Sequence, residues 1–263
     1  MTESPAAELP ADVFTGVGVA LLTLLNGAGD VDTQATGALA ADLVGRGMRS
    51  VLACGTTGEP ATLTDAERRA VISAVRAAVP PEIPVLAGTG ATSAQRAAQL
   101  TAEAVEAGAE AVLAWPPPGS EDLDGYFAAI AAAAQNRPVL AYHIPWISAP
   151  GVPVAALESL PVAGIKDSSG NPDRLLEEIA YYRGATYTGS SALLAMAGPM
   201  GGTGAILAAA NLEPELCCAA FAGDGTAQRE LAEVHLAGRA GGPPALKRIL
   251  AERNGACALS RAS

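Results

Sequence analysis

Short apolar runs alternate with longer amphipathic stretches along nearly the whole chain. Within most of the runs apolar residues fill consecutive positions, which is typical of strands in a parallel sheet covered on both faces. We therefore predict strands at 17–23, 50–54, 85–88, 111–115, 139–142, 164–166, 186–188 and 204–207.

The stretches between these runs carry the start signals of helices. Thr64 and Glu67 form a capping-box pattern before a helical run, and Ser93 is placed to cap a helix over 94–107. Pro172 suits the first turn of a helix over 173–182. The alanine-rich stretch 128–134 is expected to be a packed helix rather than a linker.

Eight strand–helix units follow one another in about 210 residues, roughly 25 residues each, which is near the lower size range of a (β/α)8 TIM barrel. A doubly wound open sheet is the competing architecture, but no dinucleotide-binding fingerprint follows the first strand. The predicted fold is therefore an α/β TIM barrel with a short C-terminal helical extension. Residues 1–212 form its core, and 213–263 supply the last barrel helix and a shortened helical segment, with helices at 216–221, 228–236 and 245–251.

The charge, the apolar runs and the cysteines of the chain disfavour several classes of function. The chain has 263 residues and a formal net charge of −11, which disfavours binding to nucleic acid or to an anionic membrane. No apolar run is long enough to cross a bilayer, and the acidic N-terminus does not resemble a signal peptide. Cys54, Cys217, Cys218 and Cys257 form no CxxC pair and are expected to be reduced. We expect a cytoplasmic protein.

Only two of the sixteen basic residues are lysines, Lys166 and Lys247. Lys166 ends an apolar strand, where burial lowers the pKa of an amine and leaves it free to attack a ketone and form a Schiff base. Arginine cannot do this, because a guanidinium keeps its proton in proteins. The structural alternative is an ion pair between Lys166 and Asp167. Lys247, beside Arg248, is expected to lie on the solvated surface.

Tyr142 ends the preceding strand and can lie beside Lys166, because neighbouring parallel strands are about 4.8 Å apart. A phenol there can move the protons that Schiff-base formation requires, although a tyrosine at the barrel rim is also possible. His143 points the other way and is expected to stabilise a loop.

The segment Gly55-Thr56-Thr57-Gly58-Glu59 follows the second predicted strand. Two glycines flanking two hydroxyls let backbone N–H groups approach an anion, and a carboxylate suits this nest better than a phosphate because no lysine or arginine is near in sequence. A plain turn followed by a helix cap is the alternative.

Five motifs in this order resemble the dihydrodipicolinate synthase / N-acetylneuraminate lyase family: GTTGE at 55–59, AGTG at 87–90, YHIP at 142–145, GIKDSSG at 164–170 and GGTGAI at 201–206. The resemblance runs from about residue 14 to residue 223. It implies a (β/α)8 barrel, class I aldolase chemistry, a pyruvate-like 2-oxo acid as donor or product and an aldehyde as the other substrate. It implies neither a metal nor an organic cofactor, and a homo-oligomer, either a dimer or a tetramer.

By motif match, the resemblance makes Lys166 the Schiff-base lysine and Tyr142 a proton-relay residue together with Thr56. The resemblance also implies that Thr56 and Thr57 hold the carboxylate of the 2-oxo acid, and Gly55 belongs to the same binding segment. Gly189 and Ile206 are expected to line the pocket.

At several positions the chain lacks the residues that dihydrodipicolinate synthases or neuraminate lyases carry. Pro118 stands where the synthases carry a second relay tyrosine, and Ile147 stands where they carry a substrate-binding arginine. The lyases carry acidic residues where this chain has Ser190 and Ser191, and the C-terminal helical region is shortened after Leu236.

We therefore expect a Schiff-base lyase or aldolase that is neither a true dihydrodipicolinate synthase nor a true neuraminate lyase. A dehydratase of keto-deoxy sugar acids and a catalytically silent barrel that binds a 2-oxo acid are the alternatives. Acceptor specificity is expected in the loops 115–120, 146–151 and 189–191.

Overall fold

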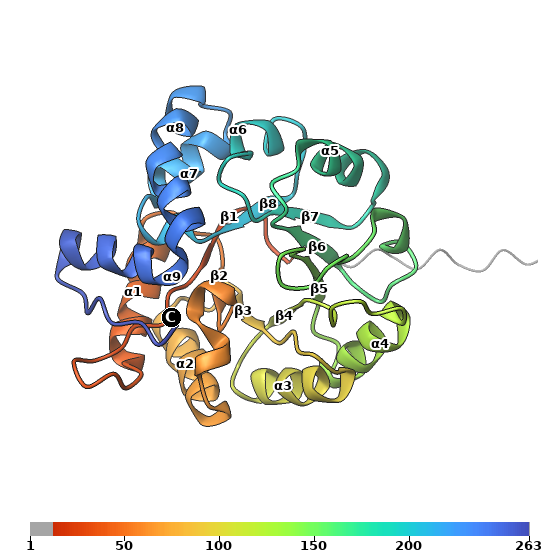
Figure 1. Ribbon diagram of the computed structural model, residues 1–263, viewed down its shortest axis with the longest axis horizontal. Coiled ribbons are helices and arrows are strands. Elements are labelled where there is room, and N and C mark those ends of the chain that lie inside the picture. The colour runs from red at the N-terminus through yellow and green to blue at the C-terminus, as the bar shows by residue number, and fades with distance from the viewer. Residues whose placement is uncertain (1–12, 263) are drawn as a thin grey trace, which may run out of the picture.

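Eight parallel strands form a closed barrel in the computed structural model, which describes residues 13–262. The strands are β1 (Gly16–Ala20), β2 (Val51–Ala53), β3 (Val85–Gly88), β4 (Ala111–Ala114), β5 (Val139–His143), β6 (Gly164–Asp167), β7 (Ala185–Thr188) and β8 (Gly204–Leu207). They pair in chain order, and β1 closes the ring against β8 (Figure 1). The predicted TIM barrel is confirmed. Residues 1–12, which make up most of the acidic N-terminus that does not resemble a signal peptide, lie outside the described residues.

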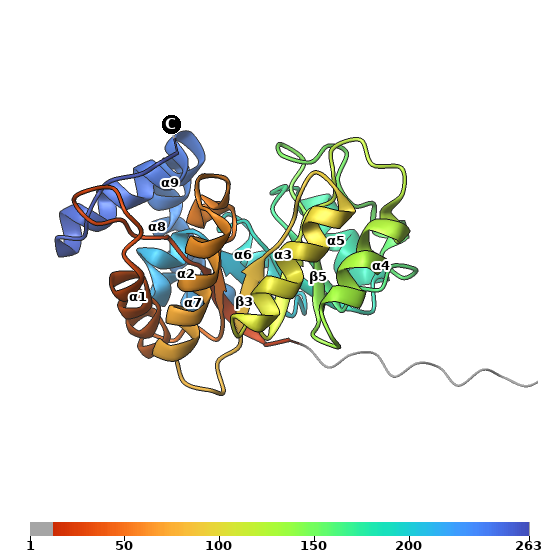
Figure 2. The same ribbon diagram turned by 90° about the horizontal axis from the view of Figure 1, so that it is seen from below.

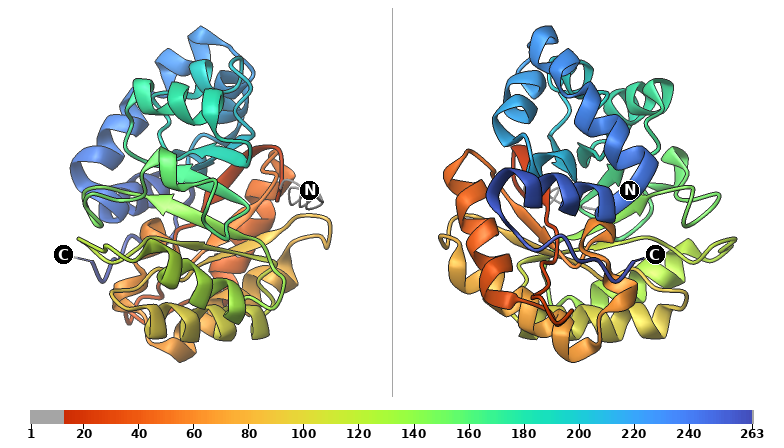
Figure 3. Two further views of the ribbon diagram at one scale, coloured as in Figure 1. Left: turned by 90° about the vertical axis from the view of Figure 1, so that its right-hand side faces the viewer. Right: turned by 60° about the vertical axis from the view of Figure 1, so that its left-hand side comes forward.

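Helices surround the barrel (Figures 1 and 3). They are α1 (Thr33–Gly45), α2 (Asp65–Ala78), α3 (Ala94–Glu106), α4 (Leu123–Ala133), α5 (Pro172–Tyr181), α6 (Leu194–Ala197), α7 (Pro214–Phe221), α8 (Gly225–Glu230) and α9 (Ala232–Asn254). Short 3₁₀ turns occur at Thr56–Gly58, Pro60–Thr62, Val154–Ala156 and Ala209–Asn211. None of the helices in the described range is long and apolar enough to cross a lipid bilayer.

Both faces of the strands are buried, which explains their apolar runs. Leu52, Leu86 and Leu140 belong to a cluster that fills the barrel interior, while Val51 and Val85 pack outward under the helices. Because side chains alternate along a strand, the inward set at the end of β5 and β6 includes Tyr142 and Lys166.

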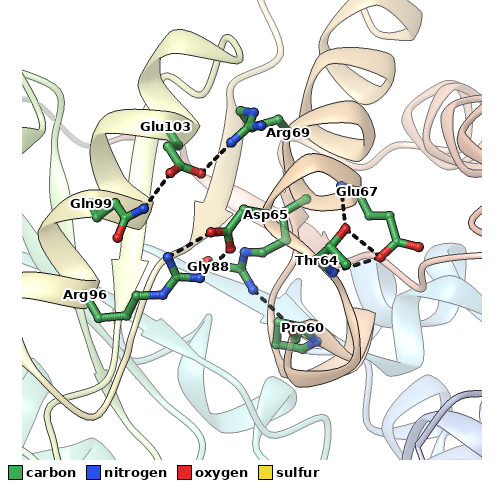
Figure 4. A network of polar contacts seen from close by, with 10 residues as sticks. Pro60, Thr64, Asp65, Glu67, Arg69, Gly88, Arg96, Gln99 and Glu103 are labelled. Carbon is green, nitrogen blue, oxygen red and sulfur yellow. Dashed lines mark hydrogen bonds and ion pairs between the residues drawn. The ribbon is translucent and has the colours of Figure 1, made fainter.

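The predicted helix starts are confirmed. Thr64 and Glu67 form a complete capping box at the start of α2, drawn in Figure 4. Ser93 caps α3, and Pro172 occupies the first turn of α5. Arg96 on α3 is paired with Asp65 on α2, so the two helices are also joined by charge (Figure 4).

One connection differs from a repeated strand–helix unit. Between β5 and β6 the described chain holds only the 3₁₀ turn Val154–Ala156 and no α-helix. Pro145, Pro150, Pro153 and Pro161 lie in this connection, and each removes a backbone donor and restricts the residue before it. The connection therefore cannot continue as a helix.

The C-terminal segment folds back onto the barrel. Helix α9 lies at one side of the barrel end, close to α8 (Figures 2 and 3). It bends at Gly242, whose φ of 55° is non-helical. The prediction of one continuous helix over 228–236 is wrong, because two helices meet there: α8 ends at Glu230 and α9 begins at Ala232.

Candidate active site

Lys166 and Tyr142 are paired neighbours on β6 and β5. The Lys166 side chain is almost fully buried, with the residue 4% exposed, and its Nζ lies 4.5 Å from the centre of the Tyr142 ring. The two chemically active groups predicted from the sequence are therefore brought together at the C-terminal end of the barrel strands, where TIM-barrel enzymes carry their active sites.

Burial lowers the pKa of Lys166 to about 7. No carboxylate of the described residues lies within 4 Å of its Nζ, so nothing there holds the amine in its charged form. Asp167 faces away from the barrel interior and lies 3.9 Å from Arg174. The alternative of a structural ion pair between Lys166 and Asp167 is wrong.

The Tyr142 phenol is held in a network of hydroxyls. Ser168 Oγ donates a hydrogen bond of 3.1 Å to the phenol oxygen. Burial raises the pKa of Tyr142 to about 12, and the hydroxyls of Ser168 and Thr56 offset part of that rise. The phenol is therefore protonated at neutral pH, and because Ser168 donates to it, its own proton remains available to another acceptor.

A cavity of about 440 Å³ opens above the Lys166 amine. Thr56, Thr57, Gly189 and Ile206 line it, as expected from the sequence. Gly55 instead lines a smaller cavity, which shares Thr56 and Tyr142 with the larger one. The predicted anion nest thus reaches the main cavity through its two threonines.

Gly189 leaves room for the lysine. A Cβ atom at this position would lie 3.0 Å from Lys166 Cε and would collide with Ser168 Oγ. Because both neighbours are buried and the Ser168 hydroxyl is bonded to Tyr142, a side chain at position 189 would displace the reactive pair.

The threonine loop is anchored from the far end of the chain. Glu59, which ends this loop in a left-handed conformation, accepts a 2.7 Å hydrogen bond from Lys247 Nζ on α9. The expectation that Lys247 is solvated surface is wrong, because its side chain is fully buried in this ion pair. Apolar neighbours such as Leu246 and Leu250 place this face of α9 against the barrel.

His143 has a structural role, as expected. Its Nδ1 accepts a hydrogen bond of 3.1 Å from the backbone N–H of Val152 in the β5–β6 connection. Burial, together with the charge of Arg174, lowers the pKa of His143 to about 4, so the ring is neutral at physiological pH.

Two of the three loops expected to set specificity reach the cavity. Trp146 lines it from one side and Ser190 and Ser191 from another. Trp115 instead lines the smaller cavity, and its ring packs against Gly90, where a Cβ atom would lie 2.6 Å from the indole.

Sequence reasoning missed the contribution of α9. His235, Arg239 and Leu246 line the cavity, as does Ser168 beside Tyr142. The sequence offered one signal for α9: His235 and Arg239 are spaced by four residues, which places them on one helical face, whereas Leu246 follows the bend at Gly242. The position of that face above the barrel follows from tertiary packing alone.

Comparisons with known proteins identify the family of the chain. The Dihydrodipicolinate synthetase family matches residues 13–236. The chain belongs to this family. It is 35% identical over 219 residues to 4-hydroxy-tetrahydrodipicolinate synthase of Synechococcus sp. (strain WH7803), a match that covers 80% of this chain and 72% of the relative.

Solved structures of the family share the fold. Dihydrodipicolinate synthase from Agrobacterium tumefaciens superposes with a TM-score of 0.83 at 30% identity, covering 94% of this chain and 92% of that one. The synthase from Acinetobacter baumannii, solved in complex with pyruvate, gives 0.80 at 28% identity and covers 91% and 88%. Like its family, the chain is a class I aldolase or lyase.

Proposed function

We propose that the protein joins or cleaves a carbon–carbon bond next to a pyruvate-like 2-oxo acid that is bound covalently to Lys166. The observation that carries the proposal is the buried Lys166 amine, whose pKa is about 7 and whose Nζ lies 4.5 Å from the Tyr142 ring centre. The relative from Acinetobacter baumannii was solved with pyruvate, which supports this donor.

The reaction starts when the neutral Lys166 amine attacks the keto carbon of the acid. A proton passes to the former keto oxygen, water leaves and a protonated iminium forms. The iminium withdraws electrons, so a proton leaves the adjacent carbon and the resulting enamine attacks an aldehyde. Water then releases the product and restores the amine. In the cleavage direction the same steps run backwards.

The surrounding residues have separate roles in this proposal. Tyr142 delivers and accepts the protons of the carbinolamine and dehydration steps, with Thr56 as its relay partner. Thr56 and Thr57 bind the carboxylate of the acid. Gly189 and Ile206 shape the wall beside the amine.

The side chains that the dihydrodipicolinate synthases and the neuraminate lyases use for their second substrates are absent from their usual positions in this chain. Pro118 and Ile147 provide no hydroxyl and no guanidinium, and Ser190 and Ser191 provide no carboxylate for sugar hydroxyls. The curated relatives named as synthases share about a third of their residues with this chain, which leaves room for a different second substrate.

Reductive trapping tests the proposal. Borohydride added with pyruvate should leave a stable three-carbon adduct on Lys166, located by peptide mass spectrometry. Lys166→Met should give no adduct, and Tyr142→Phe should slow its formation. An unmodified wild-type chain that still binds pyruvate would show a silent barrel. Analysis of the products formed from 2-oxo acids with aldehydes would separate an aldolase from a dehydratase.

A further inference from the structure

Helix α9 forms one wall of the cavity that contains Lys166, and His235 and Arg239 are the polar side chains of this wall. His235, Gly238, Arg239 and Gly242 all line the cavity. The first three stand at positions i, i+3 and i+4, so they lie on one face of the helix before it bends at Gly242. Nothing in the Schiff-base chemistry of Lys166 uses this wall, which makes it available for a different part of the ligand.

Arg239 has no carboxylate partner within 4 Å among residues 13–262. Its Cζ lies 5.9 Å from the centre of the Trp146 ring, in the loop that follows β5. A Cβ atom added to Gly170, in the loop that follows β6, would lie 3.9 Å from its Nη1. The guanidinium is therefore placed over the two strands that carry Tyr142 and Lys166.

The remaining lining favours an anion. No aspartate or glutamate among the described residues lines the cavity. His235 shares a 2.9 Å hydrogen bond with Ser191 Oγ, and burial, aided by the charge of Arg239, lowers the pKa of its ring. The imidazole is thus neutral at physiological pH, and Arg239 is the charged group of the wall.

The cavity is also larger than the 2-oxo acid alone requires. Its volume of about 440 Å³ lies within the range of pockets that hold drug-sized ligands. Thr56, Thr57 and Lys166 line the same cavity as Arg239 on α9, so a ligand bound at Lys166 shares this space with the guanidinium.

We propose that Arg239 determines specificity by binding a carboxylate on the second substrate, at the end remote from the carbon that reacts. This inference rests on the proposed Schiff-base function of Lys166. The planar guanidinium can hold a carboxylate through two parallel hydrogen bonds, and the neighbouring His235–Ser191 pair can bind a hydroxyl of the same substrate.

Condensation of pyruvate with an aldehyde that carries a carboxylate gives a 2-oxo acid with a second, remote carboxylate. Matched pairs of 2-oxo acids, which resemble this product, therefore test the proposal by calorimetric titration. 2-Oxoglutarate, 2-oxoadipate and 2-oxopimelate carry a second carboxylate, whereas 2-oxopentanoate, 2-oxohexanoate and 2-oxoheptanoate end in a methyl group at the same chain length. For at least one length, the wild type should bind the dicarboxylate about 10- to 100-fold more tightly.

Arg239→Gln should reduce that preference to within about twofold, and Arg239→Lys should restore part of it. Arg248→Gln is the matched control, because Arg248 is an exposed arginine on α9 that does not line the cavity; it should keep the full preference. A wild type without any preference, or an Arg239→Gln variant that keeps it, would overturn the proposal.

Pyruvate trapping on the same proteins keeps the two proposals apart. If Lys166 is trapped in every variant but no preference exists, only the role of Arg239 is overturned. If the preference exists and disappears in Arg239→Gln while the wild type is never trapped, the carboxylate site is supported and the Schiff-base function is overturned.

Discussion

At the scale of single residues, the protonation state of Lys166 controls the proposed reaction. The amine has no ion-pair partner in the described structure, and burial places its pKa at about 7 instead of 10.5. An amine must lose its proton before it can attack a carbonyl, so this burial makes a large fraction of Lys166 reactive near neutral pH.

The pH dependence of trapping follows from this pKa. Below pH 7 the rate of adduct formation with pyruvate and cyanoborohydride should rise about tenfold per pH unit, and it should level off above pH 7. The rate is measured by intact mass at short reaction times. Nα-acetyl-lysine, treated in parallel, should still gain reactivity up to about pH 10. A trapping rate for the protein that keeps rising until about pH 10 would contradict the lowered pKa of Lys166.

At the scale of elements, the Glu59–Lys247 pair connects the threonine loop to α9. Both side chains are almost fully buried, and Ser260 also donates a hydrogen bond to Glu59. A buried ion pair contributes little net energy, but removal of one partner leaves a charge in a site without water. The pair therefore fixes the relative positions of two elements that line the cavity.

Lys247→Met should lower the free energy of unfolding by about 3–5 kcal/mol, measured by urea titration, because Glu59 is left buried without a counter-charge. The double variant Glu59→Gln with Lys247→Met should recover part of this loss. Arg248→Gln, one position further along α9 and exposed, should change stability by less than about 0.5 kcal/mol. A loss in Lys247→Met no larger than in this control would mean that the pair does not anchor α9.

The same pair shows how far sequence reasoning reaches. The strands, the capped starts of α2, α3 and α5 and the Lys166–Tyr142 neighbourhood follow from local patterns, because strand register and helix capping depend on residues close in sequence or on adjacent strands. Lys247 was misassigned because its partner lies 188 positions away. Arg239 was missed for the same reason, since its place above the barrel depends on how α9 packs.

At the scale of the whole molecule, one buried carboxylate makes stability depend on pH. Glu178 on α5 is fully buried and lies 2.9 Å from Arg174. Burial and the nearby charge of Asp167 nevertheless raise its pKa to about 8. Because the folded pKa exceeds the unfolded value near 4.5, Glu178 favours folding most below pH 4.5, and this contribution is lost as pH rises through about 8.

Glu178→Gln should remove the decrease in stability that Glu178 causes as pH rises through about 8. Its free energy of unfolding relative to the wild type should increase by about 1 kcal/mol or more between pH 6 and pH 9, measured by chemical denaturation at each pH. Glu177→Gln changes the same charge at the exposed neighbouring position and should show no such trend. Parallel curves for Glu178→Gln and the wild type would contradict the raised pKa.

Two different segments of the chain contribute the two parts of the cavity. In the proposed reaction the amine that activates the donor comes from β6, within the ring of strands, whereas another wall of the cavity comes from α9, a helix that follows the last strand. If α9 selects the second substrate as proposed, exchange of residues on that wall should alter which substrate is accepted without any change to the strands that hold the amine. New substrate ranges are therefore best sought by randomising α9 while the barrel is kept constant.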